Sequence, residues 1–260
     1  MRRLVSVLTI AVTLACGGTR ASLSGEPKYG RSAEDDYKAG QLELKEKNYL
    51  EATKFFERVR TKYPFSKFAA LSELRLADAH FDQDHFVEAA DAYNQFLKLH
   101  PTHEEADYAA YRVALAHWKD GPSDFVLFPP SYEKDLVQVR DAAKSLREFV
   151  ANPAYKDSKY RPEAEKILKQ ATGMLAEHEW YVAQFYVKRA RWPGAAARLQ
   201  ALVTDYPGSP HEAEALLGLA NAYVKMDEPY RAQQALQQLI VKHPQDPRRA
   251  QAEKLLASIR

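Results

Sequence analysis

The apolar and polar positions of this chain repeat with a period of 37 residues. The segment 74–81 (LRLADAHF) lies over the segment 111–118 (YRVALAHW) after that shift, and four of the eight positions are identical. Prolines recur at the same spacing, at Pro64 and Pro101 and again at Pro207 and Pro244. Self-similarity at a fixed period of this size is the signature of a repeat array. We therefore expect a row of similar units, each a helix, a short turn, a second helix and a proline-containing turn.

Each unit carries small residues where its two helices must approach each other. In the first helices these are Gly40, Ala77, Ala114, Ala183 and Ala220. In the second helices they are Ala52, Ala89, Ala142, Ala195 and Ala232, each followed four positions later by a larger apolar residue: Phe56, Tyr93, Leu146, Leu199 or Leu236. These offsets match the tetratricopeptide (TPR) pattern. The sequence thus predicts an all-α fold, a right-handed superhelix of about five TPR helix-turn-helix units.

The third unit departs from this spacing. Ala89 and Ala142 are 53 residues apart, so about sixteen residues are inserted. The insertion, at 119–135, contains four glycine or proline residues and the apolar run Phe125–Phe128. Loops of this length are usually functional or disordered, and we weigh a partner contact equally against packing onto the adjacent helices. Two parts follow: units one to three at 32–157, and units four and five at 158–260, with an extra helix at 158–173 joining them.

The N-terminus has the features of an export signal. Arg2 and Arg3 precede an apolar run of twelve residues, which is too short to span a bilayer. The run ends in small residues before Cys16, with Thr13 where a bacterial lipobox usually has a large apolar residue. We expect a signal peptide at 1–15, lipidation of Cys16, a flexible tether at 16–31, and attachment to the periplasmic face of the outer membrane. The alternatives are an ordinary secreted protein cut near Ala15, or an unlipidated buried thiol.

Composition and charge argue against several classes of function. Removal of Arg2 and Arg3 leaves 35 basic against 35 acidic residues, whereas nucleic-acid binding favours a basic surface. Five histidines stand outside the i, i+4 spacing of a helical zinc site: His80, His85, His100, His103 and His117. We find no phosphate-binding loop, nucleophile elbow or paired acidic motif. We therefore expect no enzyme activity, cofactor, metal or nucleic-acid partner.

Several short motifs follow one another in a fixed order along the chain. They are Tyr63-Pro64-Phe65-Ser66, Pro101-Thr102-His103, Asp107-Tyr108, the segment 179–186 (EWYVAQFY) and Asp205-Tyr206-Pro207. Together with the insertion and the cysteine after the apolar leader, they resemble the outer-membrane-protein assembly lipoprotein family BamD. The resemblance extends from about Asp36 to Lys242. It implies a scaffold of the β-barrel assembly machinery that binds the POTRA region of BamA, other BAM lipoproteins and unfolded outer-membrane proteins.

Candidate contact residues follow from this resemblance and from the repeat. For a substrate groove in the N-terminal half we name Tyr63, Phe65, Tyr108, Tyr111 and Arg112, although Tyr63 and Phe65 are as compatible with stapling units one and two together. For BamA we name Arg189, Arg191 and Arg198. Large aromatic residues at the repeat positions are expected in the core: Tyr93, Phe96, Trp118 and Phe149. The rival function is another periplasmic TPR lipoprotein, such as a secretin pilotin or a cell-envelope coordinator.

Overall fold

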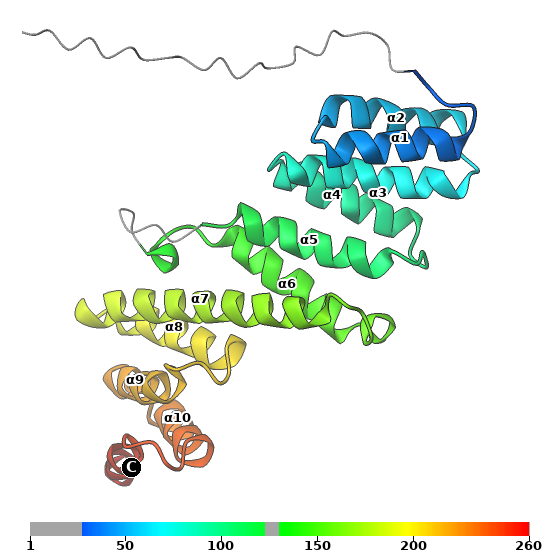
Figure 1. Cartoon of the computed structure of the whole chain (residues 1–260). Helices are drawn as coiled ribbons and strands as arrows, with labels where there is room; N and C mark the ends of the chain where they lie inside the picture. Colours follow the sequence, from blue (N-terminus) through cyan, green and yellow to red (C-terminus); the bar gives the residue numbers. More distant parts are fainter. Residues whose placement is uncertain (1–27, 123–129, 260) are drawn as a thin grey trace, which may run out of the picture.

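The computed structural model describes residues 28–122 and 130–259, and these residues form eleven α-helices with no strand. The helices stack in chain order, each packed mainly on the one before and the one after (Figure 1). Their bounds are α1 Ala33–Lys45, α2 Tyr49–Lys62, α3 Lys67–Asp82, α4 Phe86–Leu99, α5 Ala106–Asp120, α6 Val137–Ala151, α7 Arg161–Lys188, α8 Trp192–Asp205, α9 Glu212–Lys225, α10 Pro229–Lys242 and α11 Arg249–Ser258. The predicted all-α array of helix pairs is confirmed.

The small residues lie where the two helices of each unit meet, as predicted. Ala77, Ala114, Ala183 and Ala220 are fully buried, and so are all five small residues of the second helices. A Cβ atom at Gly40 would lie 2.7 Å from the ring of Phe56, so only glycine allows α1 and α2 to pack this closely. Interiors packed to crystal density leave no space for an added methyl group at such a contact.

The turn between the two helices has the same geometry in four of the five units. Each first helix ends in a Schellman motif, in which one residue adopts a positive φ angle. In unit four, Ala190 has φ +51°, and the Arg191 N–H donates to the Tyr186 carbonyl at 3.0 Å. The equivalent residues are Lys47, Asp84 and Asp227. Unit three has the insertion at this point.

Replacing Ala190 by glycine should stabilise the protein by about 0.5–1 kcal/mol, because alanine pays a steric penalty in the left-handed region that glycine avoids. Thermal unfolding of the purified protein measures the change as a rise in Tm. Ala197→Gly, at an exposed position inside α8, is the matched control and should destabilise by about 1 kcal/mol. A lower Tm for Ala190→Gly would contradict this account of the turn.

The connections between units also share one conformation. In four of the five units, the residue that ends the second helix has φ between −131° and −123° and precedes a proline: Tyr63, His100, Tyr206 and His243. Proline disfavours the helical region for the residue before it, so these four positions end their helices. The predicted stop positions are therefore confirmed.

The long helix α7 connects the two halves differently from the prediction. Residues 161–173, expected to belong to a separate joining helix, form the first part of α7, which continues without a break to Lys188. This helix packs on α6 with its first part and on α8 with its second. The residues on both sides of the exposed Gly173 favour helix formation, so the helix continues through this glycine.

The two ends of the stack and the insertion complete the fold. Residues 1–27, with the expected signal peptide, Cys16 and most of the tether, lie outside the described residues, as does the apolar run at 125–128. The last residues of the expected tether are held in place, since Tyr29 packs on Phe55 and the Gly30 N–H donates to Asp36. Within the insertion, residues Ser131–Glu133 form a 3-10 turn that packs against α7.

Candidate protein-binding site

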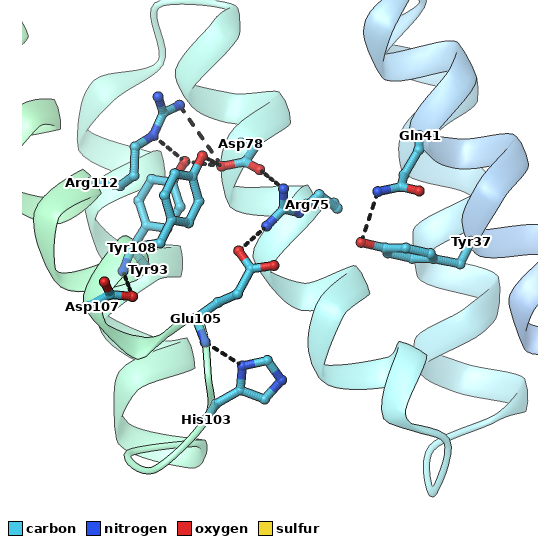
Figure 2. A network of polar contacts seen from close by, with 10 residues as sticks. All are labelled: Tyr37, Gln41, Arg75, Asp78, Tyr93, His103, Glu105, Asp107, Tyr108 and Arg112. Atoms are coloured by element: carbon cyan, nitrogen blue, oxygen red, sulfur yellow. Dashed lines mark hydrogen bonds and ion pairs between the residues drawn. The ribbon is translucent and has the colours of Figure 1, made fainter. Parts of the chain in front are cut away.

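A buried carboxylate joins the first helices of units two and three. Asp78, on α3, accepts hydrogen bonds from the hydroxyls of Tyr93 at 2.5 Å and Tyr108 at 2.7 Å (Figure 2). Its second oxygen lies 3.2 Å from the guanidinium of Arg75, one turn earlier on the same helix. Only 5% of Asp78 is exposed. We call these residues, with Arg112, the Asp78 cluster.

Two arginines at equivalent repeat positions approach this carboxylate. Arg75 and Arg112 are 37 residues apart in sequence. Arg75 also binds the Glu105 carboxylate at 2.8 Å, whereas Arg112 donates from Nε to the Tyr93 hydroxyl at 2.9 Å. The Arg112 guanidinium covers the ring of Phe81 at 3.6 Å. Stacking and charge-assisted hydrogen bonds fix its plane.

The electrostatics of the Asp78 cluster keep its tyrosines protonated and its arginines charged. Burial, together with the negative charge of Asp78, raises the pKa of Tyr93 and of Tyr108 above the ordinary tyrosine value. Burial opposes the charge on Arg75, but the carboxylates of Asp78 and Glu105 outweigh this effect and raise its pKa. The pKa of Arg112 is raised as well. The two tyrosine hydroxyls and the two guanidiniums therefore remain in the forms that hold the cluster together, and none of them is poised to transfer a proton near neutral pH.

A groove of about 710 Å³ opens beside the Asp78 cluster. It runs from α3 across the start of α5 to the loop before α7. Its lining residues are Arg75, Glu104, Glu105, Asp107, Tyr108, Asp157, Ser158, Lys159 and Tyr160. The Ser158 hydroxyl donates to Asp107 at 2.6 Å, which ties the loop to α5. The groove is thus a preformed surface whose walls are supported by buried contacts.

The structure brings two of the five substrate-groove candidates together. Tyr108 lines the groove, and Arg112 approaches the same Asp78 carboxylate. Tyr111 lies instead in the core between α5 and α7, stacked on Tyr160 at 5.1 Å. Tyr63 and Phe65 lie in the turn between α2 and α3, where Phe65 is fully exposed, and the described contacts do not join them to Tyr108 or Arg112.

The three BamA-contact candidates lie close together in sequence but differ in their surroundings. Arg198, on α8, forms an ion pair at 3.1 Å with Glu179, a buried carboxylate on α7. Arg189 is exposed, and its guanidinium covers the ring of Phe185 at 3.6 Å. Arg191 is exposed at the start of α8, with no side-chain partner among the described residues. Two of these three cations are therefore available to an external carboxylate.

Sequence reasoning missed the residue at the centre of the cluster. Asp78 stood inside the motif that revealed the repeat, where the third unit has Leu115. The signal in the sequence was a carboxylate at a position that the repeat assigns to the core, close to Arg75, whose equivalent in the next unit is Arg112. Tyr93, Phe96 and Phe149 are buried as predicted, and Trp118 is partly buried. The hydroxyl partner of Tyr93 was not foreseen.

The described residues form neither a metal-binding cluster nor a membrane-spanning helix. No three histidine, cysteine, aspartate or glutamate side chains among residues 28–122 and 130–259 gather in a way that would hold a metal ion. Within the same ranges, every helix is too short or too polar to cross a membrane.

Comparison with known proteins gives relatives along nearly the whole chain. BamD, the outer membrane protein assembly factor of Neisseria meningitidis serogroup B, is 27% identical over 251 residues, covering 95% of this chain and 93% of its own. BamD of Pasteurella multocida is 26% identical over 239 residues, covering 87% and 86%. Among solved structures, the TPR2AB-domain:pHSP90-complex of yeast Sti1 matches with a TM-score of 0.39 and 15% identity, over 87% of this chain and 84% of that one.

A family model gives the assignment. The model of YfiO, described as an outer membrane lipoprotein, matches residues 30–239, which include all of α1 to α9 and most of α10. The matched region thus contains the Asp78 cluster, the groove beside it and the three arginines of the C-terminal half. The chain belongs to the YfiO family of outer membrane lipoproteins, and BamD assembly factors are among its relatives.

Proposed function

We propose that this chain is a non-catalytic scaffold of the outer-membrane β-barrel assembly machinery. The observation that carries the proposal is the family match across the helical stack. It is supported by a relative named as an assembly factor, which this chain matches over 93% of that relative's length. Lipidation at Cys16 attaches the stack to the periplasmic face of the outer membrane. The stack then holds other proteins on fixed surfaces, as repeat arrays do, because each unit adds rigid side chains to one extended face.

In this proposal the N-terminal half receives unfolded outer-membrane proteins. The groove beside the Asp78 cluster offers the rings of Tyr108 and Tyr160, 5.4 Å apart, next to charged and polar side chains. Aromatic faces bind varied sequences, which suits substrates that share little sequence. Arg112 acts through the cluster, because it fixes Tyr93 and covers Phe81. The exposed Phe65 and the half-buried Tyr63 provide a separate apolar contact at the turn between units one and two.

The C-terminal half binds the POTRA region of BamA and contributes contacts to other BAM lipoproteins. Arg189 and Arg191 provide exposed positive charge for POTRA carboxylates. Arg198 presents its outer edge from a fixed position, because Glu179 holds the guanidinium. Charge pairs at the rim of an interface mainly raise the association rate and set the choice of partner.

The double variant Arg189→Glu with Arg191→Glu should weaken binding of the BamA POTRA region at least about tenfold, because both charges then repel the partner's carboxylates. Isothermal titration calorimetry at low salt measures this change. Lys98→Glu, an exposed cation at the end of α4, is the matched control and should bind like the unaltered protein. Equal affinity of the double variant and the control would remove these two residues from the interface.

Arg198 requires a milder substitution. Glutamate at this position would stand beside the buried Glu179 and disturb the packing of α7 on α8. Arg198→Lys keeps the charge while losing the planar guanidinium, so it tests the geometry of recognition without leaving Glu179 unpaired. The rival function, a secretin pilotin or a cell-envelope coordinator, predicts no POTRA binding by any of these proteins.

A further inference from the structure

One face of α2 combines cations at helical spacing with exposed apolar side chains. Leu50, Lys54, Arg58 and Lys62 follow one another at intervals of four residues, so they lie on the same side of the helix. Leu50 is 71% exposed. Tyr29 lies alongside, its ring 4.2 Å from the Arg58 guanidinium and 39% exposed. We call these five residues the α2 face.

A shallow groove of about 450 Å³ follows the α2 face. Its lining has three cations (Lys54, Arg58 and Lys62) and a single carboxylate, Glu57, which is engaged with Arg60 at 2.7 Å. Arg58 pairs at 3.0 Å with the fully buried Asp36, and 27% of the Arg58 side chain is exposed. Lys54 pairs with Glu51, and Lys62 has no carboxylate partner among the described residues. In the lining itself the cations therefore outnumber the carboxylates three to one, beside the exposed Leu50.

The position of this face limits what it can meet. The other sides of α2 pack on α1 and α3, so the α2 face forms one end of the described stack (Figure 1). The chain leaves the described residues at Lys28, directly beside Tyr29. Twelve residues, 16–27, separate that point from Cys16 and span at most about 40 Å when extended. A lipid at Cys16 would thus keep the α2 face within that distance of the bilayer.

We propose that the α2 face is a membrane-contact surface that recognises anionic lipid headgroups and orients the stack on the bilayer. This inference rests on the proposed anchor at Cys16. Lysine and arginine side chains near an anionic surface are attracted to its phosphates, and tyrosine and leucine enter the interfacial layer beside them. Alone, the α2 face would bind the membrane weakly. The lipid anchor makes the contact effective, because the short tether keeps the α2 face at a high effective concentration near the bilayer surface.

A label at Leu50 tests the proposal in the lipidated protein. Leu50→Cys carries an environment-sensitive fluorophore, and the protein's own cysteine is acylated. In vesicles of 30% phosphatidylglycerol and 70% phosphatidylethanolamine, the emission should shift to the blue and be quenched by nitroxide lipids. Val241→Cys, 77% exposed on α10 near the other end of the stack, is the control and should report water. In pure phosphatidylcholine vesicles both labels should report water.

Charge reversal separates headgroup recognition from other causes of shielding. Lys54→Glu with Lys62→Glu should reduce the membrane-contacting population of the Leu50 label at least about tenfold, since each lysine near an anionic surface contributes several-fold. A Leu50 label that stays in water in anionic vesicles, equal shielding in neutral vesicles, or shielding that appears only with outer-membrane proteins would each overturn the proposal. Release of the protein by carbonate would overturn the anchor as well, whereas an anchored protein with a water-exposed Leu50 contradicts only the membrane contact.

Discussion

Replacing Asp78 by alanine is expected to destabilise the protein by about 3–5 kcal/mol. The substitution takes a shared carboxylate away from two partly buried arginines, Arg75 and Arg112, and removes the acceptor of two tyrosine hydroxyls. Arg75 keeps Glu105 and Arg112 keeps Asp82 at 3.7 Å, but both guanidiniums lose their most buried counter-charge, and the two tyrosine hydroxyls lose their acceptor, which adds to the penalty. Urea unfolding followed by circular dichroism measures the change as a lower midpoint.

The control for this prediction is Asp91→Ala, which removes an exposed carboxylate from α4, the neighbouring helix. It should change stability by no more than about 0.5 kcal/mol. Asp78→Asn retains one acceptor oxygen and should fall between the two. If Asp78→Ala unfolds at the same urea concentration as Asp91→Ala, the cluster does not hold units two and three together.

Ending the chain before Pro247 is expected to destabilise the last unit by about 2–4 kcal/mol. The deletion removes α11, whose Ala252 is fully buried and whose Leu255 and Leu256 pack, with the following Ile259, on the core of α9 and α10. Terminal repeats need a cap, because an uncapped end exposes its apolar interface to water. Hydrogen exchange followed by mass spectrometry should show faster exchange in α9 and α10 and little change in α1 to α4.

Lys254→Ala provides the comparison for the deletion. Lys254 is exposed on α11, so its loss leaves the apolar side of this helix in place and exchange in α9 and α10 unchanged. Unaltered protection of α9 and α10 in the truncated protein would contradict a capping role for α11.

The repeat made most of the fold predictable from sequence. Small residues at fixed offsets and prolines 37 residues apart located both helices of every unit, because close helix packing and helix termination each accept few residue types. The prediction of a separate joining helix at 158–173 was wrong, because residues 161–173 belong to α7. Helix-favouring residues around Gly173 allow α7 to continue, and the intrinsic preference of one glycine does not decide where a helix ends.

The candidate site was less predictable, because side-chain pairing depends on which register positions face each other across units. Tyr108 and Arg112 were named from the sequence, but Asp78, which holds both, was not. Tyr111 follows Tyr108 by three positions on the same helix, yet it is buried in the core and does not line the groove. For Arg198, the resemblance gave the position, and only the structure revealed Glu179 as its partner.

We propose above that this helical stack serves β-barrel assembly as a membrane-anchored scaffold. Affinity purification of the chain from detergent-solubilised outer membranes, followed by mass spectrometry, tests it most directly. The account predicts recovery of an acylated Cys16 peptide together with a POTRA-containing barrel protein. Recovery of only a secretin or a cell-wall protein, or of a chain with a free thiol in the soluble periplasmic fraction, would contradict it.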